Sequence, residues 1–150
     1  MEPILVRDLM TSKVFTLRPD ATMARLYELM DSKHIRHLPV VDGDGDLVGL
    51  VTHRDLLRSA LADRSDLPMA IQRQALETVL VSEIMTTAVE TIEPDQDIRD
   101  AVDLMMENKF GCLPVVEGDR LVGIITEADF VRYLAKIAAG RKAVPKRATR

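Results

Sequence analysis

The sequence predicts a mixed α/β (α+β) fold in which one β-α-β-β-α unit occurs twice. Three observations support this prediction. The chain of 150 residues contains an internal repeat. Each copy carries apolar residues at helical spacing, followed by two β-rich runs. Aromatic residues make up only 3% and Trp is absent, so the core must be built from aliphatic side chains. This length fits two small repeats that share a core.

The repeat is visible as segments that recur at a nearly constant offset. Residues 6–11 (Val-Arg-Asp-Leu-Met-Thr) recur at an offset of 75 as residues 81–86 (Val-Ser-Glu-Ile-Met-Thr). The run Leu-Pro-Val-Val at 38–41 recurs at 113–116. One residue is then lost in a Gly/Asp turn, and Leu-Val-Gly at 47–49 matches 121–123 at an offset of 74. A length change confined to a turn is what a repeated fold tolerates.

The first two elements of each copy are a short extended segment and a helix. The extended segments are expected at 14–17 and 89–92, and Pro19-Asp20 and Pro94-Asp95 are expected to start the helices. Apolar residues then fall at i, i+3, i+4 and i+7, which is the spacing of one buried helical face. These residues are Met23, Leu26, Tyr27 and Met30 in the first copy, and Ile98, Ala101, Val102 and Met105 in the second.

The remaining elements are two strands and a second helix. Runs at 38–41 and 47–51, and at 113–116 and 121–125, are joined by Gly/Asp turns and predict hairpins. The second helices are expected to begin near Thr52 and Thr126. Residues 63–80 are expected to form a helical connection, broken near Pro68. Because that connection has no Gly/Ser-rich stretch, we expect the copies to be rigidly docked.

Composition narrows the class of protein. No apolar run approaches the length of about 20 residues that spans a bilayer, and the first residues lack the pattern of a signal peptide. A cytoplasmic location is therefore expected. The single cysteine, Cys112, excludes an internal disulfide and a thiolate-cluster metal site, and its apolar surroundings indicate an inert packed thiol.

Charge is distributed unevenly along the chain. The net charge is −4, yet six of the 20 Lys and Arg residues and none of the 24 acids lie in residues 136–150. Residues 137–150 are therefore expected to form a basic C-terminal tail that is solvated and frayed. The acidic remainder of the chain would repel nucleic acid, whose binding depends on phosphate neutralisation. Few aromatic residues are available for stacking on bases, so the sequence argues against a nucleic-acid partner.

The repeated elements together resemble the CBS domain, and the two copies resemble a CBS pair. The resemblance rests on segments that occur in the same order in both copies: residues 6–11, 34–42 (His-Ile-Arg-His-Leu-Pro-Val-Val-Asp) and 47–57, then 81–86, 111–117 and 121–130. It places one CBS domain at 6–62 and the other at 81–136. It implies two repeats packed about a pseudo-twofold axis, with two clefts between them that bind AMP, ADP, ATP or S-adenosylmethionine. It also implies regulation of a partner protein, and no obligatory cofactor.

The motif Gly-x-x-Thr-x-x-Asp, at 49–55 and 123–129, carries the sharpest functional expectation. The resemblance implies that Asp55 and Asp129 accept hydrogen bonds from ribose hydroxyls and that Thr52 and Thr126 contact phosphate. A carboxylate is a suitable acceptor for a diol, and a helix start is a suitable anion site. The same spacing also fits a capping box, in which Thr caps the helix and Asp reaches back. Both interpretations stay open at this stage.

The resemblance adds further residues to the expected nucleotide site. The stretches before and through each Leu-Pro pair would meet the adenine through backbone groups, and the extended segments would close the pocket. The complete expected set is Val14, Thr16, Arg36, His37, Leu38, Pro39, Thr52, His53, Arg54, Asp55, Val89, Thr91, Gly111, Cys112, Leu113, Pro114, Thr126 and Asp129. Because Gly111, Glu127 and Ala128 replace Arg36, His53 and Arg54, the first copy is expected to be the better anion site.

Other chemistry is not supported by the sequence. His34 and His37 lead into a strand and have no third ligand nearby, so no metal site is expected. The acidic turn at 42–46 lacks the Gly and Glu that a calcium loop needs at its sixth and twelfth positions. No phosphate loop, nucleophile elbow or Cys–His pair is present, so no enzyme activity is expected. The alternative to a nucleotide sensor is a scaffold of the same fold without a ligand.

The helices that follow Thr52 and Thr126 are expected to mediate dimerisation. They carry more apolar residues than each repeat needs internally: Leu56, Leu57, Phe130, Val131 and Leu134. In CBS pairs such helices meet in a dimer, so the sequence predicts a homodimer.

Overall fold

The computed structural model describes residues 2–61, 74 and 76–140. Most of the predicted connection at 63–80 and of the basic tail at 137–150 therefore lies outside the described residues. The chain divides into two compact units. Unit 1 comprises Met1–Val14 and Glu90–Arg150, and unit 2 comprises Phe15–Val89. Each unit thus combines the hairpin of one sequence repeat with the opening segment of the other.

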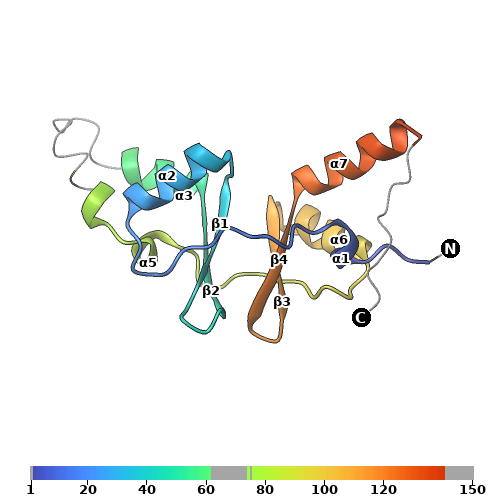
Figure 1. Cartoon of the computed structure of the whole chain (residues 1–150), viewed down its shortest axis with the longest axis horizontal. Helices are drawn as coiled ribbons and strands as arrows, with labels where there is room; N and C mark the ends of the chain where they lie inside the picture. The colour runs from blue at the N-terminus through green and yellow to red at the C-terminus, as the bar shows by residue number, and fades with distance from the viewer. Residues whose placement is uncertain (1, 62–73, 75, 141–150) are drawn as a thin grey trace. The chain divides into compact units, whose positions relative to one another are not determined.

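Unit 2 is built around the hairpin of the first repeat (Figure 1). Strands β1 (His37–Val41) and β2 (Leu47–Thr52) pair antiparallel, with an irregularity between Val40 and Val41. Helix α2 (Met23–Lys33) precedes the hairpin, and helix α3 (His53–Leu61) follows it. A parallel bridge joins Leu17 to Val40, and an antiparallel bridge joins Leu50 to Thr86, just beyond α5 (Val81–Ile84). The hairpin therefore gains a short extended neighbour on each side.

Unit 1 repeats this arrangement with the second hairpin (Figure 1). Strands β3 (Cys112–Glu117) and β4 (Arg120–Thr126) lie between helices α6 (Ile98–Asn108) and α7 (Glu127–Ala138) in the chain. Ile92 bridges Val115 in parallel, and Thr11 bridges Ile124 antiparallel, just beyond α1 (Val6–Leu9). The segment on the β4 side comes from the start of the chain, more than 100 residues before the strand that it joins.

The hairpins and the second helices are confirmed to within about one residue. The starts predicted for the first helices are wrong, because Pro19-Asp20 and Pro94-Asp95 form turns and the helices begin three residues after each Asp. Polar side chains at the actual starts explain this position. Thr22 accepts a hydrogen bond from the Arg25 amide at 3.2 Å, and Asp97 accepts one from the Arg99 amide at 2.8 Å.

The short helices α1 and α5 were not predicted. Each contains only four residues, which is too short to show an apolar period. In each helix an acidic side chain turns back to the residue that precedes the helix. Asp8 accepts a hydrogen bond from the Leu5 amide at 2.8 Å, and Glu83 accepts one from the Leu80 amide at 2.6 Å. These contacts satisfy one backbone donor at the start of each turn.

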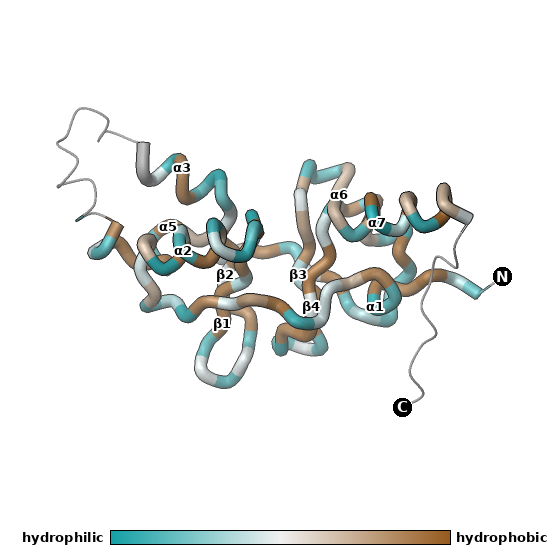
Figure 2. Tube along the Cα trace, turned by 45° about the horizontal axis from the view of Figure 1, so that its top comes forward, coloured by the Kyte–Doolittle hydropathy of each residue, from teal (hydrophilic) through white to brown (hydrophobic). Residues whose placement is uncertain are grey.

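Each unit has its own aliphatic core. In unit 2 Met23, Leu26 and Met30 are buried as predicted, but Tyr27 is 55% exposed, so its assignment to the buried stripe is wrong. Leu29 is buried instead, so the buried face of α2 extends to the side of the helix away from Tyr27. In unit 1 Ala101 and Met105 are buried, and Ile98 packs against the core. In Figure 2 the hydrophobic segments of the strands contrast with the more hydrophilic turns that join them.

Two glycines allow the opening segments to approach the hairpins. A Cβ atom on Gly123 would lie 2.7 Å from the Met10 sulfur and 3.0 Å from the Thr11 carbonyl oxygen. A Cβ on Gly49 would meet Met85 and the Thr86 carbonyl in the same way. The Leu-Val-Gly motif is therefore explained by a close backbone contact in each unit.

Candidate functional site

The carboxylate of Asp129 lies at the start of α7 in unit 1, and its side chain is only 2% exposed. One oxygen, Oδ2, accepts hydrogen bonds from the Thr126 amide at 2.8 Å and from the Thr126 hydroxyl at 3.4 Å. The other oxygen, Oδ1, accepts a hydrogen bond from the Thr11 hydroxyl at 3.1 Å and pairs with the Arg132 guanidinium. All the contacts of this buried charge are therefore to polar or cationic donors, as burial of a carboxylate requires.

Asp55 occupies the matching place at the start of α3 in unit 2. Its Oδ2 accepts hydrogen bonds from the Thr52 amide at 2.9 Å and the Thr52 hydroxyl at 3.0 Å, and its own amide donates to that hydroxyl at 3.2 Å. Its Oδ1 is 4.0 Å from the Arg58 guanidinium. At 16% exposed, the Asp55 side chain is more open to solvent than that of Asp129.

The capping geometry weighed from the sequence is present at both positions. In each unit Oδ2 closes the first turn of the helix, and Oδ1 faces away from the cap. A carboxylate oxygen has two lone pairs, so capping by Oδ2 leaves Oδ1 as the acceptor that a ligand hydroxyl would use. Capping and ligand contact therefore fall on different oxygens of the same side chain.

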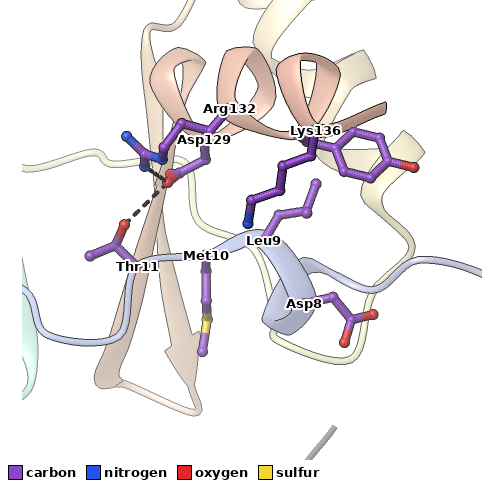
Figure 3. Close-up of a pocket in the computed structure, with 8 residues that line it drawn as sticks. Asp8, Leu9, Met10, Thr11, Asp129, Arg132 and Lys136 are labelled. Atoms are coloured by element: carbon purple, nitrogen blue, oxygen red, sulfur yellow. Dashed lines mark hydrogen bonds and ion pairs between the residues drawn. The ribbon is translucent and has the colours of Figure 1, made fainter. Parts of the chain in front are cut away.

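A polar pocket of about 240 Å³ lies beside Asp129 (Figure 3). Its floor is formed by α1 and the two residues that follow it, and its roof is formed by α7. The lining residues are Asp8, Leu9, Met10, Thr11, Asp129, Arg132, Tyr133 and Lys136. All of them belong to unit 1. The pocket offers hydroxyl, carboxylate and cationic groups, which suit a polar ligand that carries both hydroxyls and negative charge.

Of the residues that line this pocket, only Asp129 was expected at the site, and the polar side chains that sequence reasoning missed include Thr11, Arg132 and Lys136. Two of them left a signal in the repeat. Arg58 and Arg132 each follow the motif Asp by three residues, and Thr11 and Thr86 occupy matching places in the opening segments. That Thr11 reaches Asp129 follows only from the exchange of opening segments between hairpins, which no local pattern indicates.

The residues expected from the resemblance are divided between the units. Unit 1 contains Val14, Thr91, Gly111, Cys112, Leu113, Pro114, Thr126 and Asp129. Unit 2 contains Thr16, Arg36, His37, Leu38, Pro39, Thr52, His53, Arg54, Asp55 and Val89.

Residues near each Leu-Pro pair hold the motif helices through the backbone. The His53 amide donates to the Arg36 carbonyl at 2.8 Å, and the Glu127 amide donates to the Gly111 carbonyl at 3.2 Å. Leu38 and Leu113 are fully buried, so their side chains belong to the cores. His53 and Arg54 are exposed at the start of α3.

Unit 2 has a second polar pocket, of about 280 Å³, between the end of α2 and the start of α3. It is lined by Tyr27, Met30, Asp31, His34, Ile35, Arg36 and His53. Two residues of the expected nucleotide set, Arg36 and His53, therefore share a pocket. His34, which lines this pocket, ends α2 in a left-handed backbone conformation (φ 53°).

Cys112 is buried at the start of β3. Burial raises the pKa of its thiol to about 12, because the charged thiolate is poorly solvated there. The described residues contain no group of three or more His, Cys, Asp and Glu side chains that could hold a metal ion. Of the helices in that part of the chain, none is long and apolar enough to cross a membrane.

Comparison with known proteins identifies the repeats. A family model for the CBS domain matches residues 6–62 and 81–136. A CBS domain-containing protein of Dictyostelium discoideum is 35% identical over 138 residues, which cover 89% of this chain and 93% of that protein. An uncharacterized protein of Methanocaldococcus jannaschii is 33% identical over 86% of this chain, but only 42% of its own length is matched. An inosine-5′-monophosphate dehydrogenase of the same organism matches over only 21% of its length.

Solved structures with the same fold include proteins with bound adenosine compounds. A Vibrio cholerae protein assigned to acetoin utilization has a TM-score of 0.79 at 36% identity, covering 92% of this chain and 95% of that one. CBSX2, solved in complex with AMP, has a TM-score of 0.73 at 29% identity, covering 89% and 98%. A CBS domain pair solved with 5′-methylthioadenosine and S-adenosyl-L-methionine has a TM-score of 0.71 at 25% identity, covering 94% and 100%. These likenesses confirm the predicted fold class.

Proposed function

Since this chain belongs to the CBS-domain family and carries a pair of CBS repeats, we propose that it is a regulatory module that binds an adenosine nucleotide and acts on a partner protein. The observation that carries this proposal is the repeated Thr-x-x-Asp at the start of α3 and α7, with a polar pocket beside Asp129. Similar structures were solved with AMP and with S-adenosylmethionine, which supports an adenosine ligand.

In this proposal each residue type of the motif has a separate role. Oδ1 of Asp55 and of Asp129 accepts hydrogen bonds from ribose hydroxyls, while Oδ2 keeps the helix cap. The Thr52 and Thr126 hydroxyls and the helix starts face the phosphate. Arg36 and Arg54 add positive charge in unit 2, and His37 and His53 add imidazole groups beside them. Backbone groups at 36–39 and 111–114 meet the adenine, and the segments with Val14, Thr16, Val89 and Thr91 close the sites.

The ligand is AMP, ADP, ATP or S-adenosylmethionine, and no cofactor is obligatory. The protein is not an enzyme in this proposal, and its effect is exerted through a regulated partner in the cytoplasm. Nucleic acid is not among its partners. The match to an inosine-5′-monophosphate dehydrogenase supports a non-enzymatic role, because only a small part of that enzyme resembles the present chain.

A homodimer is part of the proposal, and unit 1 offers a surface for it. An apolar groove between α6 and α7 includes Met106, Phe110, Val131 and Leu134, all of which are exposed. Lys109 and Glu127 also line this groove. Leu56, which was expected to serve the interface, is buried in the unit 2 core and does not contribute.

A ligand-free scaffold of the same fold is the second candidate. One observation favours it: both carboxylate oxygens of Asp129 already have protein partners. Under this alternative the two carboxylates only cap helices.

Native mass spectrometry of the protein purified from its own cells separates the two functions. The sensor function predicts an added mass that corresponds to AMP, ADP, ATP or S-adenosylmethionine on part of the population. This mass should decrease after extensive dialysis. A bare chain that also gains no mass when it is mixed with each of these four compounds would favour the scaffold.

A further inference from the structure

Helix α7 presents a polar face to the pocket of unit 1. Asp129, Arg132, Tyr133 and Lys136 stand at i, i+3, i+4 and i+7, so they share one side of the helix, and all four line the pocket. The apolar groove residues Val131 and Leu134 lie on a different side. Figure 2 shows the corresponding alternation of hydrophobic and hydrophilic residues along α7. The charged residues Asp129, Arg132 and Lys136 thus line the pocket. Val131 and Leu134 line the groove, and Tyr133 lies between the two sets and lines both.

Lys136 brings a positive charge to this pocket. Figure 3 shows its side chain reaching from α7 toward Leu9 and Met10. Among residues 2–61, 74 and 76–140, Lys136 makes no ion pair. Asp8, the other acid of the pocket, points away from Lys136 in Figure 3 and accepts a hydrogen bond from the Leu5 amide. The cation is therefore available to an anion that enters the pocket.

Arg132 lies one turn before Lys136 and pairs with Oδ1 of Asp129. A ribose hydroxyl that takes its place on Oδ1 would keep that oxygen hydrogen-bonded and release the guanidinium. The released guanidinium has donors for two oxygens of a phosphate group. Since Arg132 is 62% exposed, it can turn without opening the core.

We propose that Arg132 and Lys136, rather than Thr126, which does not line the pocket, form the phosphate subsite of the unit 1 pocket, so that this pocket binds a nucleoside phosphate such as AMP more tightly than the uncharged nucleoside adenosine. This inference rests on the proposed adenosine-nucleotide function. The motif residues alone indicated that the first copy is the better anion site. Arg132 and Lys136 lie beyond the motif, so they add positive charge to the second copy that the motif does not show.

Unit 2 provides a natural contrast. Arg58 matches Arg132, but Ser59 and Ala62 stand where unit 1 has Tyr133 and Lys136. The Ser59 hydroxyl contacts the Met23 sulfur at 3.4 Å. The Lys136 cation therefore has no equivalent on α3, and its removal affects only the unit 1 pocket.

The test compares the affinities of AMP and adenosine, which differ only by the phosphate. Because unit 2 is also proposed to bind AMP, the full chain with Asp55→Asn is the starting protein for every variant, and its isothermal titration gives the ratio of the two dissociation constants for unit 1. We expect Lys136→Gln and Arg132→Gln each to reduce the advantage of AMP over adenosine about ten-fold, as loss of a charge-assisted contact does. Lys109→Gln, which removes a cation from the apolar groove of the same unit, should leave that ratio unchanged.

Two further arms separate this inference from the proposed function. In the Asp129→Ala background, Lys136→Gln should no longer change the ratio, because the unit 1 pocket is already impaired. The effect of Lys136→Gln should also shrink at high salt, which screens charge. If the wild type binds AMP but Lys136→Gln leaves the ratio unchanged, or lowers it no more than Lys109→Gln does, this inference is wrong and the proposed function stands. If the wild type binds neither AMP, adenosine nor S-adenosylmethionine, both are wrong.

Discussion

The hydroxyl of Thr11 donates a hydrogen bond of 3.1 Å to Oδ1 of Asp129, which lies 118 residues later in the chain. Thr11 belongs to the opening segment of the first repeat, and Asp129 belongs to the last helix of the second. This contact therefore joins the two ends of the repeated sequence inside one compact unit. It also places a residue from the start of the chain directly at the candidate site.

Replacing Thr11 with Val tests this contact. Thr11→Val removes the hydroxyl but keeps the branched shape, and it leaves a buried carboxylate oxygen with one donor fewer. We expect the unfolding free energy to fall by about 1.5–3 kcal/mol, the usual range for a hydrogen bond to a charged group. Chemical denaturation measures this change.

Thr86→Val is the matched control, because Thr86 fills the same place in the other opening segment and is exposed. No side-chain hydrogen bond of Thr86 occurs among the described residues, and its bridge to Leu50 uses the backbone only. Its substitution should change the unfolding free energy by less than about 0.5 kcal/mol. Equal effects of the two variants would contradict the role given to Thr11.

Gly123→Ala tests the close approach of the opening segment to β4. The added methyl group would collide with the Met10 sulfur and the Thr11 carbonyl. We expect a loss of about 1–3 kcal/mol in unfolding free energy, typical of overpacking. Gly43→Ala is the control, since its nearest atom is the flexible Arg18 guanidinium at 3.4 Å. A tolerated Gly123→Ala would show that the segment packs more loosely.

Local patterns in the sequence were sufficient to predict the hairpins and the helices that flank them. The period of Met23, Leu26 and Met30 and the turns with Gly45 and Gly118 are local signals. The start of α2 was misplaced because Pro19-Asp20 resembles a helix start, whereas Thr22 provides the cap. Tyr27 was misassigned because its spacing fits both the edge of a buried stripe and a pocket wall.

In the candidate site, the motif residues were predictable from the sequence, but the side chains that surround them were not. Asp129 and Thr126 form a local motif, and their spacing alone indicated both capping and ligand contact. Thr11 reaches the site only through the exchange of opening segments, a long-range event without a sequence period. Arg132 and Lys136 are ordinary helix-surface residues by composition, and only the position of α1 under α7 makes them part of a pocket.

Cys112 should be chemically inert in the folded protein. Because burial raises the pKa of its thiol to about 12, almost no thiolate exists at pH 8, and the thiolate is the reactive form. We expect iodoacetamide to label the native protein very slowly and the denatured protein rapidly. Mass spectrometry of a time course measures both rates. Rapid stoichiometric labelling of the native chain would place Cys112 at the surface.

The apolar groove of unit 1 should mediate the proposed homodimer. Val131 and Leu134 are 63% and 61% exposed on α7, so Val131→Asp and Leu134→Asp should not disturb the core. We expect each to convert a dimer to a monomer in light scattering at micromolar concentration. Ile137→Asp is the control, because Ile137 is exposed on the same helix but does not line the groove. A wild-type monomer would contradict this prediction.

The central claim is that the chain binds an adenosine nucleotide through the motif carboxylates. Alanine at these positions would remove the helix cap as well, so asparagine is the sharper substitution. Asp55→Asn keeps an oxygen for Thr52 but places an amide NH₂ where Oδ1 would accept ribose hydroxyls. Asp129→Asn is the matched change in unit 1, where the carboxylate is already covered by Thr11 and Arg132.

The most direct measurement is therefore a thermal-shift titration of the wild type, Asp55→Asn and Asp129→Asn with AMP. We predict that AMP raises the melting temperature of the wild type and that Asp55→Asn melts close to the wild type without ligand. Asp55→Asn should need about ten- to hundred-fold more AMP for the same rise, and Asp129→Asn should show a smaller change. A wild type whose melting temperature does not respond to millimolar AMP, ADP, ATP or S-adenosylmethionine would contradict the claim.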